Sequence, residues 1–447
     1  MSTQARTAPA GALAILDWQG LDSGQRRAAL ARPPQGVSDE RRRETARIIA
    51  SVRAGGDAAL AELTERLDGV RPAALRVPAD AFDAAEASLT EVQRAAIRRA
   101  IDTVTTFHEA QRYEPPVVQT APGVRCSTVI RAIGRVGLYV PAGSAPLPSA
   151  VIMLAVPARI ADCERRIICS PPGADGLPDP SVLVAARYCG VEEVYAVGGA
   201  QAVAAMAYGT ESIPSCDKIF GPGNAWVTEA KLQVSLDPDG AALDLPAGPS
   251  EVLVIADDSA DPSAVAADLL SQAEHGPDSQ VLLVTPSRGL ADTVAEEVDF
   301  QLASLPRRDI AAQAIANSRM LVVDSLEQAL VVSNSYGPEH LILAVDDARR
   351  WTGSIRVAGS VFLGHYAPES LGDYCSGTNH VLPTYGYAKA WSGLGLADFQ
   401  RRISVQEVTL QGLEELGPTA VTLARLEGLE AHARAVIVRI GEGDAES

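Results

Sequence analysis

The spacing of apolar residues predicts helices in the N-terminal part of the chain. In residues 38–56, 55–69 and 87–113, apolar side chains recur three and four positions apart, which is the pattern of an amphipathic helix with one buried face. Asp57 lies where it would cap the second helix, and His108, near the end of the third, is expected to face solvent. We therefore expect this part of the chain to be mainly helical.

From about residue 130 onward, short β-branched runs alternate with alanine-rich helical stretches. The runs with strand character include 165–170, 192–197, 250–257 and 280–287. The Gly/Pro-rich segment 244–250 interrupts the series, which then restarts. Alternation of strand and helix favours parallel sheets with helices on both faces, so the two series predict two α/β domains. The C-terminal residues return to a helical pattern.

Composition limits the partners and the cellular compartment. The 447 residues include 38 basic and 56 acidic side chains, a net charge of −18, which argues against a nucleic-acid or anionic-membrane partner. No apolar run reaches the roughly 18 residues of a membrane span, and we expect no secretory signal. Six cysteines without a CxxC pair are typical of reduced thiols, so we expect a cytoplasmic protein without disulfides.

A helix with two candidate ligands at its end is predicted after Asp261. This residue suits the N-cap, Pro262 suits the first helical position, and Gly276 with the following proline ends the helix. Gln272 and His275 lie three positions apart and therefore project from one side of the last turn. A histidine that merely interacts favourably with the helix dipole is the simpler interpretation.

Two further clusters combine acidic groups with imidazoles. Glu339 and His340 are adjacent before a strand-like run, and such a pair suits proton transfer because imidazole titrates near neutrality and burial tunes a carboxylate. Asp373 and His380 lie in a loop rich in Gly, Ser, Thr and Asn, which presents side chains and backbone at close range. An exposed charged pair and a turn-forming aspartate are the alternatives.

Near the C-terminus, Glu427 and His432 form a fourth cluster. They are too far apart for one straight helical face, so Gly428 is expected to break the helix between them, and an ordinary helical tail is the alternative. The four clusters together offer nitrogen and oxygen donors without cysteine, a set that suits a catalytic Zn²⁺. The candidate donors are Gln272, His275, Asp373 and His432. Spacing alone supports this weakly, because no HExxH-type motif is present.

Two Gly-rich turns between strand and helix are candidates for nucleotide binding. They lie in residues 192–206 and 218–231, where backbone N–H groups and a helix N-terminus could meet a pyrophosphate. Neither has the GxGxxG fingerprint with an acidic residue about 20 positions further on, so a standard Rossmann motif is absent. Glycines needed only for packing are the alternative.

Between about residues 130 and 440 the chain carries long, ordered blocks. They include GLYVPAGSAPLPSAVIML, GGAQAVAAMAYGT, DKIFGPGNAWVTEAKLQV, LLSQAEHG, YGPEHLIL, ESLGDYCSGTNHVLPTYG and EGLEAHARAV. In this order the blocks resemble the histidinol dehydrogenase family. The resemblance implies a zinc-containing, NAD-dependent oxidoreductase that converts L-histidinol to L-histidine through histidinaldehyde, in the last steps of histidine biosynthesis. It also implies an intertwined homodimer.

The resemblance assigns a role to each candidate residue by its position in a motif. The zinc ligands would be Gln272, His275, Asp373 and His432, and the acid/base pair would be Glu339 and His340. Ser250, His380 and Glu427 would contact the substrate, together with the zinc ligands and His340. Tyr139, Gln201 and Asn224, one in each of three Gly-rich blocks, would contact NAD.

The expected fold is α/β, with two Rossmann-like but incomplete parallel-sheet domains and helical segments at both ends. A helical arm would occupy residues 1–32, and residues 33–138 with 250–390 would form the domain that carries the zinc and acid/base residues. Residues 139–249 would form the NAD-binding domain. The helical segment 391–447, with Glu427 and His432, would complete the partner's site.

The chemistry divides between two residues in this hypothesis. His340 would accept the hydroxyl proton in the first oxidation, and Glu339 would activate water for the second. His365 and Cys375 depart from residues common in the family but occupy no ligand or catalytic position. A zinc hydrolase without a nucleotide, an enzyme for a related amino alcohol and a non-catalytic relative are the competing interpretations. Dependence of turnover on NAD⁺ would distinguish the oxidoreductase from the zinc hydrolase.

Overall fold

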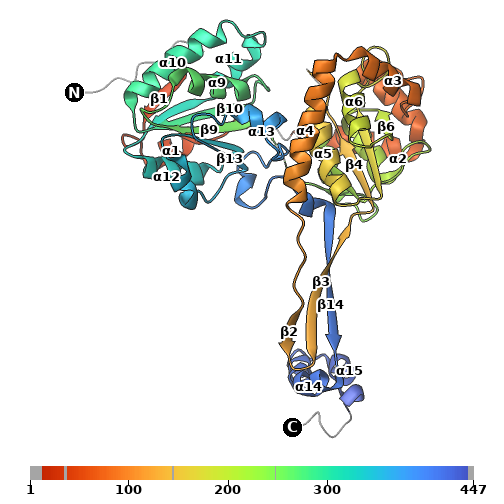
Figure 1. Ribbon diagram of the computed structural model, residues 1–447. Helices are drawn as coiled ribbons and strands as arrows, with labels where there is room; N and C mark the ends of the chain where they lie inside the picture. The colour runs from red at the N-terminus through yellow and green to blue at the C-terminus, as the bar shows by residue number, and fades with distance from the viewer. Residues whose placement is uncertain (1–12, 35–37, 143–144, 247, 441–447) are drawn as a thin grey trace.

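The computed structural model describes residues 13–34, 38–142, 145–246 and 248–440. Two α/β lobes lie side by side, and a long three-stranded arm carries a pair of helices far from both lobes (Figure 1). Each lobe contains one parallel sheet, which confirms the α/β fold with two parallel-sheet domains. Within the described part of the chain, no helix is both long and apolar enough to cross a membrane.

The first lobe is built on a six-stranded parallel sheet. Its strands in spatial order are β1 (Ala14–Asp17), β11 (Arg319–Val322), β10 (Gln280–Thr285), β9 (Glu251–Ala256), β12 (His340–Ala344) and β13 (Ser360–Leu363). The central strands are buried on both faces, which explains their continuous Val, Leu and Ile content. In β9, Val252 and Val254 pack into one core while Leu253 and Ile255 pack into the other.

Helices cover both faces of this sheet. They are α1 (Ser23–Ala29), α9 (Pro262–Ala273), α10 (Arg288–Leu302), α11 (Arg308–Ala316) and α12 (Leu326–Tyr336), with the short α13 (Glu369–Tyr374) at the side that faces the second lobe (Figure 1). Short 3₁₀ helices follow at Ala348–Ser354, Tyr387–Lys389 and Leu396–Phe399. The lobe is a closed α/β layer structure in which each apolar sheet face is covered.

The second lobe contains a five-stranded parallel sheet. Its spatial order is β6 (Val194–Ala196), β5 (Arg165–Ser170), β4 (Arg135–Tyr139), β7 (Lys218–Phe220) and β8 (Ala242–Leu243). The surrounding helices are α2 (Asp39–Asp68), α3 (Ala79–Ser88), α4 (Glu91–Glu109), α5 (Pro148–Ile160), α6 (Pro180–Tyr188), α7 (Gly199–Tyr208) and α8 (Ala225–Ser235). The chain runs from β4 outward to β6 on one side and then returns to β7 on the other. This reversal is the switch point of a doubly wound sheet.

The N-terminal helices belong with the second lobe. Helix α2 packs against α7, α3 against α6, and α4 against α5. The sequence instead grouped residues 33–138 with residues 250–390. The difference has a simple cause, because an amphipathic pattern shows which face of a helix is buried but not which sheet it covers.

Residues 13–32 also differ from the expected helical arm. Strand β1 pairs in parallel with β11, and Trp18 is buried in the core beneath the same sheet. These residues are therefore part of the six-stranded lobe, while residues 1–12 of the expected arm lie outside the described residues. The apolar residues of β1 follow one another without alternation, so no period-2 pattern identifies it from sequence.

Gly56 and Asp57 mark the place where two helices were expected. The element α2 consists of two helices that meet at a kink at Gly56, whose backbone is non-helical with a φ of +51°, as the sequence predicted. The carboxylate of Asp57 accepts a hydrogen bond from the backbone N–H of Ser212, 3.2 Å away, so Asp57 joins α2 to the second lobe and does not act as a helix cap. The proposed cap was wrong because its partner lies far away in sequence.

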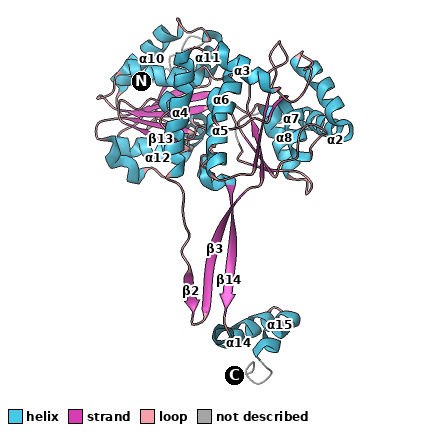
Figure 2. Cartoon of the chain, turned by 45° about the vertical axis from the view of Figure 1, so that its right-hand side comes forward, coloured by secondary structure: helices cyan, strands magenta, loops and turns pink. Residues whose placement is uncertain are grey.

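The arm consists of three antiparallel strands and ends in two helices. Its strands are β2 (Val118–Ala121), β3 (Val124–Ala132) and β14 (Gln400–Val408), and its helices are α14 (Leu410–Leu426) and α15 (Glu430–Ile440). A second view shows the same separation of these helices from the lobes (Figure 2). The segment 391–447 was expected to be helical, whereas β14 forms a long strand within it. Almost every residue of β14 is exposed, and the short alternation of Ile403 and Val405 with polar neighbours is outweighed by the helical pattern of the residues that follow.

Candidate functional site

The end of helix α9 supplies the first two candidate ligands. Asp261 caps the helix by accepting a hydrogen bond from the N–H of Ser263, 2.9 Å away, and Pro262 occupies the first turn, as predicted. Gln272 is only 1% exposed, while His275 follows the last turn and opens to solvent. A rigid helix end therefore presents one buried and one accessible side chain to the same region.

Glu339 and His340 lie at the start of strand β12, and both are buried. The Nδ1 atom of His340 lies 3.0 Å from the carbonyl oxygen of Glu251, the first residue of β9. A carbonyl oxygen only accepts hydrogen bonds, so Nδ1 carries the proton and Nε2 holds the lone pair in the neutral ring. The backbone N–H of Glu251 in turn donates to Oε2 of Glu339 at 2.8 Å.

Helix α13 adds two carboxylates to this region. Oδ1 of Asp373 lies 3.5 Å from Nε2 of His340. His275, Glu369 and Asp373 each offer one potential ligand atom, and these three atoms lie within 4.8 Å of one another. Glu369 is 1% exposed and was missed by the sequence reading, because an acidic residue in the first turn of a short helix looks like an ordinary helix-dipole partner.

The amide of Gln272 is oriented for ligation. Its side chain hydrogen-bonds to the carboxylate of Glu369, which only accepts when it is ionised, so the NH₂ group is directed there. The other atom, Oε1, is buried without a hydrogen-bond partner, as is Nε2 of His340. Buried polar atoms are normally satisfied, and an orphaned amide oxygen next to the cluster of His275, Glu369 and Asp373 is what a cation site provides. The donor set therefore fits a Zn²⁺ ion.

The acid/base pair has perturbed electrostatics. Burial raises the pKa of Glu339 to about 8, an effect that the neighbouring His340 partly offsets. For His340, burial alone lowers the pKa, but the charges of Glu339, Asp373 and Glu369 outweigh burial and raise it to about 10. Burial likewise raises the pKa of Glu369 to about 7. Such clusters of shifted groups are typical of catalytic centres.

The remaining site groups respond to the same charges. Burial alone would raise the pKa of Asp373, but the adjacent His340 and the other nearby imidazoles outweigh burial and lower it. Removal of the ring from water lowers the pKa of His275 and of His380, and the negative charge of Asp373 opposes this shift in both. His380 donates from Nδ1 to the backbone oxygen of Asp373 at 2.9 Å, which fixes its ring beside α13. Ser250 immediately precedes β9.

The site lies at the amino ends of its strands. Glu251 and His340 are the first residues of neighbouring strands β9 and β12, and α9 delivers Gln272 just before β10 begins. Doubly wound sheets usually bind ligands at the carboxyl ends. The six-stranded sheet therefore does not use its own switch-point crevice for this cluster.

The candidate nucleotide residues occupy the usual place in the second lobe. Tyr139 ends β4, Asn224 follows β7, and Gln201 lies in the first turn of α7. The hydroxyl of Tyr139 accepts the N–H of Gly199 at 3.1 Å, and Asn224 caps α8 through the N–H of Trp226 at 3.0 Å. Gln201 is buried, and its Oε1 has no hydrogen-bond partner. All three residues lie around the carboxyl ends of the strands at the switch point.

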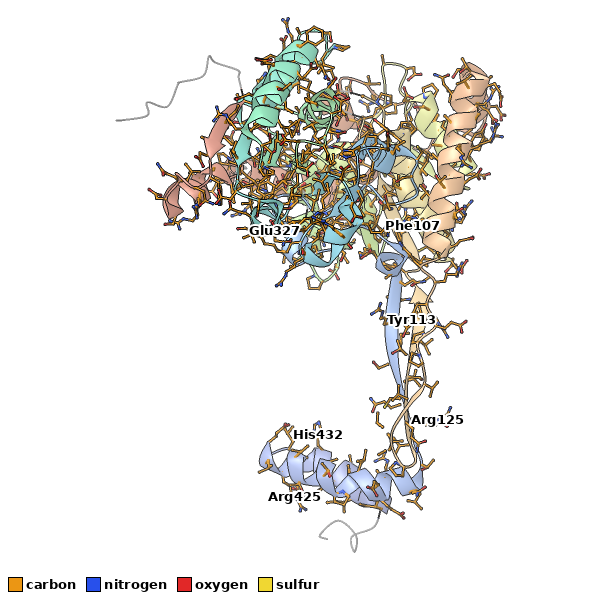
Figure 3. The ribbon with its side chains drawn as sticks, turned by 60° about the vertical axis from the view of Figure 1, so that its left-hand side comes forward. Phe107, Tyr113, Arg125, Glu327, Arg425 and His432 are labelled. Atoms are coloured by element: carbon orange, nitrogen blue, oxygen red, sulfur yellow. The ribbon has the colours of Figure 1, made fainter. Side chains whose placement is uncertain are left out.

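Glu427 and His432 are not brought to the other candidates within the chain. His432 lies on α15 at the tip of the arm, away from both lobes (Figure 3). Glu427 is the C-cap of α14, and Gly428, with φ +71°, separates the two helices as predicted. Both side chains are exposed. The structure thus assembles Gln272, His275, Asp373, Glu339 and His340, and leaves the C-terminal pair outside.

His108 is buried rather than solvated. Its Nδ1 donates to the carbonyl of Val104 at 2.9 Å, and its Nε2 lies 3.4 Å from the amide nitrogen of Asn379. Asn379 also donates to the carbonyl of Met153 on α5 at 2.7 Å. The loop that carries His380 is therefore attached to α4 and α5 of the second lobe. The sequence prediction failed because the partner loop is about 270 positions away.

Comparison with known proteins decides the family. The family model for histidinol dehydrogenase matches residues 31–440. The histidinol dehydrogenase of Xanthomonas euvesicatoria is 57% identical over 427 residues, 96% of this chain and 99% of that protein. That of Vibrio cholerae is 55% identical over 424 residues, 95% of this chain and 97% of that protein. The chain belongs to the histidinol dehydrogenase family.

A solved structure supports the same assignment. The crystal structure of histidinol dehydrogenase from Elizabethkingia anophelis superposes with a TM-score of 0.93 at 42% identity, and covers 97% of this chain and 99% of that chain. The two lobes and the arm are therefore the histidinol dehydrogenase fold. The enzyme class is that of histidinol dehydrogenase, an oxidoreductase that acts at the last step of histidine biosynthesis.

Proposed function

We propose that this chain oxidises L-histidinol to L-histidine in two steps through histidinaldehyde, with two NAD⁺ and one Zn²⁺ per site. The observation that carries this proposal is the convergence of Gln272, His275 and Asp373 beside the buried pair of Glu339 and His340. Metal donors next to a general base are the parts needed to hold an amino alcohol and remove its protons.

The metal would be held by four donors. Gln272, His275 and Asp373 come from one chain, and His432 of the partner subunit would complete the set. Zn²⁺, when bound, would fix the imidazole and amine nitrogens of the substrate, and its charge would lower the pKa of His340 toward neutrality. Glu369 would orient Gln272 so that Oε1 faces the ion, the usual role of a group that hydrogen-bonds to a ligand.

His340 would act in the first oxidation. Its proton on Nδ1 is held by the carbonyl of Glu251, so Nε2 is the atom that accepts the hydroxyl proton while hydride passes from the carbinol carbon to NAD⁺. The fixed tautomer means that no ring rotation is needed to expose the base. The product of this step is the aldehyde, NADH and protonated His340.

Glu339 would act in the second oxidation. As a carboxylate it would take a proton from water, whose oxygen attacks the aldehyde carbon, while protonated His340 returns its proton to the aldehyde oxygen to give the neutral hydrate. The hydrate then loses hydride to a second NAD⁺ and a proton to an active-site base, which leaves the carboxylic acid. A pKa of about 8, raised by burial, makes Glu339 a stronger base than an exposed glutamate.

The substrate and cofactor contacts complete the proposal. Ser250, His380 and the partner subunit's Glu427 would contact the substrate, together with the four metal donors and His340. Tyr139, Gln201 and Asn224 would contact NAD. The location of these three residues at the switch point, with a helix N-terminus and a buried unpartnered Gln201 oxygen, supports the cofactor site.

A homodimer is the assembly that this site requires. The arm holds His432 away from both lobes (Figure 3), and the other proposed donors belong to the six-stranded lobe of the same chain. Along the arm and its helices, large apolar side chains stay exposed, including Ile403 at 48%, Leu423 at 55% and Leu426 at 79%. A second copy that packs on the arm would cover such a surface. The proposed location is the cytoplasm, where the six cysteines, none of them in a disulfide, would remain reduced.

A histidinol assay with a metal control tests the function. Purified enzyme should form NADH from L-histidinol and NAD⁺, lose this activity after treatment with a chelator and recover it when Zn²⁺ is added back. Turnover without NAD⁺ would instead indicate a hydrolase. Faster NADH formation from another amino alcohol than from histidinol would indicate a changed substrate.

A further inference from the structure

Arg32 links the N-terminal segment to the first strand of the active-site lobe. It follows α1, and its side chain is 12% exposed. The guanidinium forms a two-pronged ion pair with the carboxylate of Glu251, with Nη2 and Oε2 2.9 Å apart and Nε bonded to Oε1. It also stacks 3.8 Å from the ring centroid of Tyr336. A planar fork of this kind fixes direction as well as distance.

The same guanidinium holds the turn that leads to the acid/base pair. Its Nη2 lies 3.2 Å from the carbonyl of Tyr336 and 3.1 Å from the carbonyl of Gly337, two residues before Glu339. One side chain therefore joins the start of β9 to the entry of β12. Movement of either strand relative to the other would break bonds to Arg32.

Glu251 passes this constraint to both catalytic groups. Its N–H donates to Glu339 at 2.8 Å, and its carbonyl accepts from Nδ1 of His340 at 3.0 Å. The peptide groups on both sides of one residue thus set the carboxylate of Glu339 and the ring of His340. Arg32 contacts Glu251 through the side-chain carboxylate, which is 2% exposed.

A strained residue closes the network. Tyr385 is not glycine, yet its φ is +57°. Its N–H donates to the carboxylate of Glu251 at 2.9 Å, and its hydroxyl donates to the carbonyl of Pro33 at 2.7 Å. Left-handed backbone at a bulky residue costs free energy, and such strain concentrates at functional sites. A buried ion pair is also weak support for stability, since desolvation offsets its attraction.

We propose that Arg32 and Glu251 form a positioning pair that sets the relative geometry of Glu339 and His340. The N-terminal segment thereby becomes part of the active-site machinery without touching the substrate. This inference rests on the proposed roles of Glu339 and His340. It assigns Arg32 and Glu251 an effect on turnover rather than on binding of metal or substrate.

The test compares Arg32→Ala with Arg26→Ala in the zinc-loaded enzyme. Arg26 is the matched control, because it also anchors the N-terminal segment, with its guanidinium 5.2 Å from the ring of Trp18 and a hydrogen bond of 3.2 Å to the Trp18 carbonyl. Arg32→Ala should lower kcat about 10²-fold, the effect of a misplacement of about 1 Å, with little change in the KM for histidinol or in zinc content. Arg26→Ala should leave kcat near the wild-type value.

Two further measurements keep the result interpretable. Methylguanidinium added to Arg32→Ala should recover part of kcat, because it can fill the vacated site and restore the fork. If Arg32→Ala fails to fold because Glu251 is left unpaired, the double variant Arg32→Ala/Glu251→Gln removes that buried charge. The double variant should remain folded and still show the loss in kcat.

The outcomes separate this inference from the proposed function. His340→Asn and Glu339→Gln are measured in parallel. If both are impaired while folded Arg32→Ala, or the folded double variant, has wild-type kcat, Arg32 does not position the pair. Equal losses in Arg26→Ala and Arg32→Ala would reduce Arg32 to a structural anchor. Wild-type activity in His340→Asn and Glu339→Gln would overturn the proposed function itself.

Discussion

His340 and Glu251 are joined by a hydrogen bond of 3.0 Å from the imidazole Nδ1 to a backbone carbonyl at the start of the neighbouring strand. Because a backbone carbonyl cannot be titrated or rotated away, the bond fixes the ring plane and the tautomer together. The remaining nitrogen, Nε2, is buried, unpartnered and 3.5 Å from Asp373. This is the atom through which the histidine can act.

Replacement of His340 by asparagine tests this assignment. Asparagine can still donate a hydrogen bond to the Glu251 carbonyl from its NH₂ group but offers no titratable nitrogen. We expect kcat with histidinol to fall by about 10² to 10⁴-fold, the usual contribution of a general base, with the fold retained. Steady-state NADH formation and thermal unfolding measure the two properties. His365→Asn, on a ring that contacts Asp346 away from the site, should be unaffected, and equal activity of the two variants would remove the role of His340.

Replacement of Glu339 by glutamine should separate the two oxidations. Glutamine can keep the hydrogen bond from the Glu251 N–H but cannot take a proton from water. We therefore expect oxidation of supplied histidinaldehyde to be impaired more than the first oxidation of histidinol. Stopped-flow measurement of the first NADH formed, beside steady-state assays with the aldehyde, gives the ratio. Equal losses on both substrates would end this division of labour.

Much of this site could be predicted because its strongest signals are local. The cap at Asp261, the proline after it and the i, i+3 spacing of Gln272 and His275 all lie within one helix, and the structure reproduces that helix. The alternation of buried strands and alanine-rich helices likewise predicted two parallel sheets. Resemblance to a family supplied what spacing could not, namely the expectation that residues from three separate clusters share one metal.

Other features depend on long-range partners and could not be predicted. Glu369 is recognisable only beside Gln272 and His275, and Arg32 only beside Glu251, 219 positions away. Strand β14 has only a short alternation around Ile403 and Val405, and it forms a strand by pairing with β3, which is distant in the sequence. Each of these is a property of the folded chain rather than of a short window of sequence.

Removal of the Gln272 amide should weaken metal binding. Its Oε1 is buried without a partner and can be satisfied by a cation, so Gln272→Ala removes one of the proposed donors. We expect this variant to contain less zinc after dialysis against a weak chelator, measured by atomic absorption. Glu274→Gln, a change at the same helix end, should keep its zinc. If Gln272→Ala binds zinc as tightly as the wild type, the proposed ligand set is wrong.

Asp268 should make stability depend on pH. Burial raises its pKa from 3.8 to about 7, so the folded protein disfavours its charged form. A group with a raised folded pKa contributes stability that is fully present below about pH 4 and is lost as the pH rises to about 7. Asp268→Asn should therefore raise the melting temperature at pH 8, and the gain should shrink towards pH 4, with zinc held constant. The same difference between Asp268→Asn and the wild type at every pH would contradict the raised pKa.

The position of His432 at the tip of the arm leads to a prediction about mixed dimers. If the arm of one copy completes the site of the other, a heterodimer of His275→Asn and His432→Asn chains contains one site with both defects and one site with none. It should have about half the activity of the wild-type dimer, although each homodimer is inactive. Co-expression with two different tags and tandem purification isolates the heterodimer for the histidinol assay.

A matched pair of variants gives the control for this experiment. His275 and Asp373 both belong to the six-stranded lobe, so a heterodimer of His275→Asn and Asp373→Asn chains has one defect in each site and should be inactive. The same inactivity in the heterodimer that carries His432→Asn would show that the C-terminal helices do not cross to a partner. The arm would then have to fold back to bring His432 to the lobe of its own chain, a rearrangement that must break the pairing of β14 with β3 or move the whole three-stranded arm. Activity in the heterodimer that carries His432→Asn, but not in the heterodimer of His275→Asn and Asp373→Asn chains, would therefore show that the partner copy supplies the fourth metal donor.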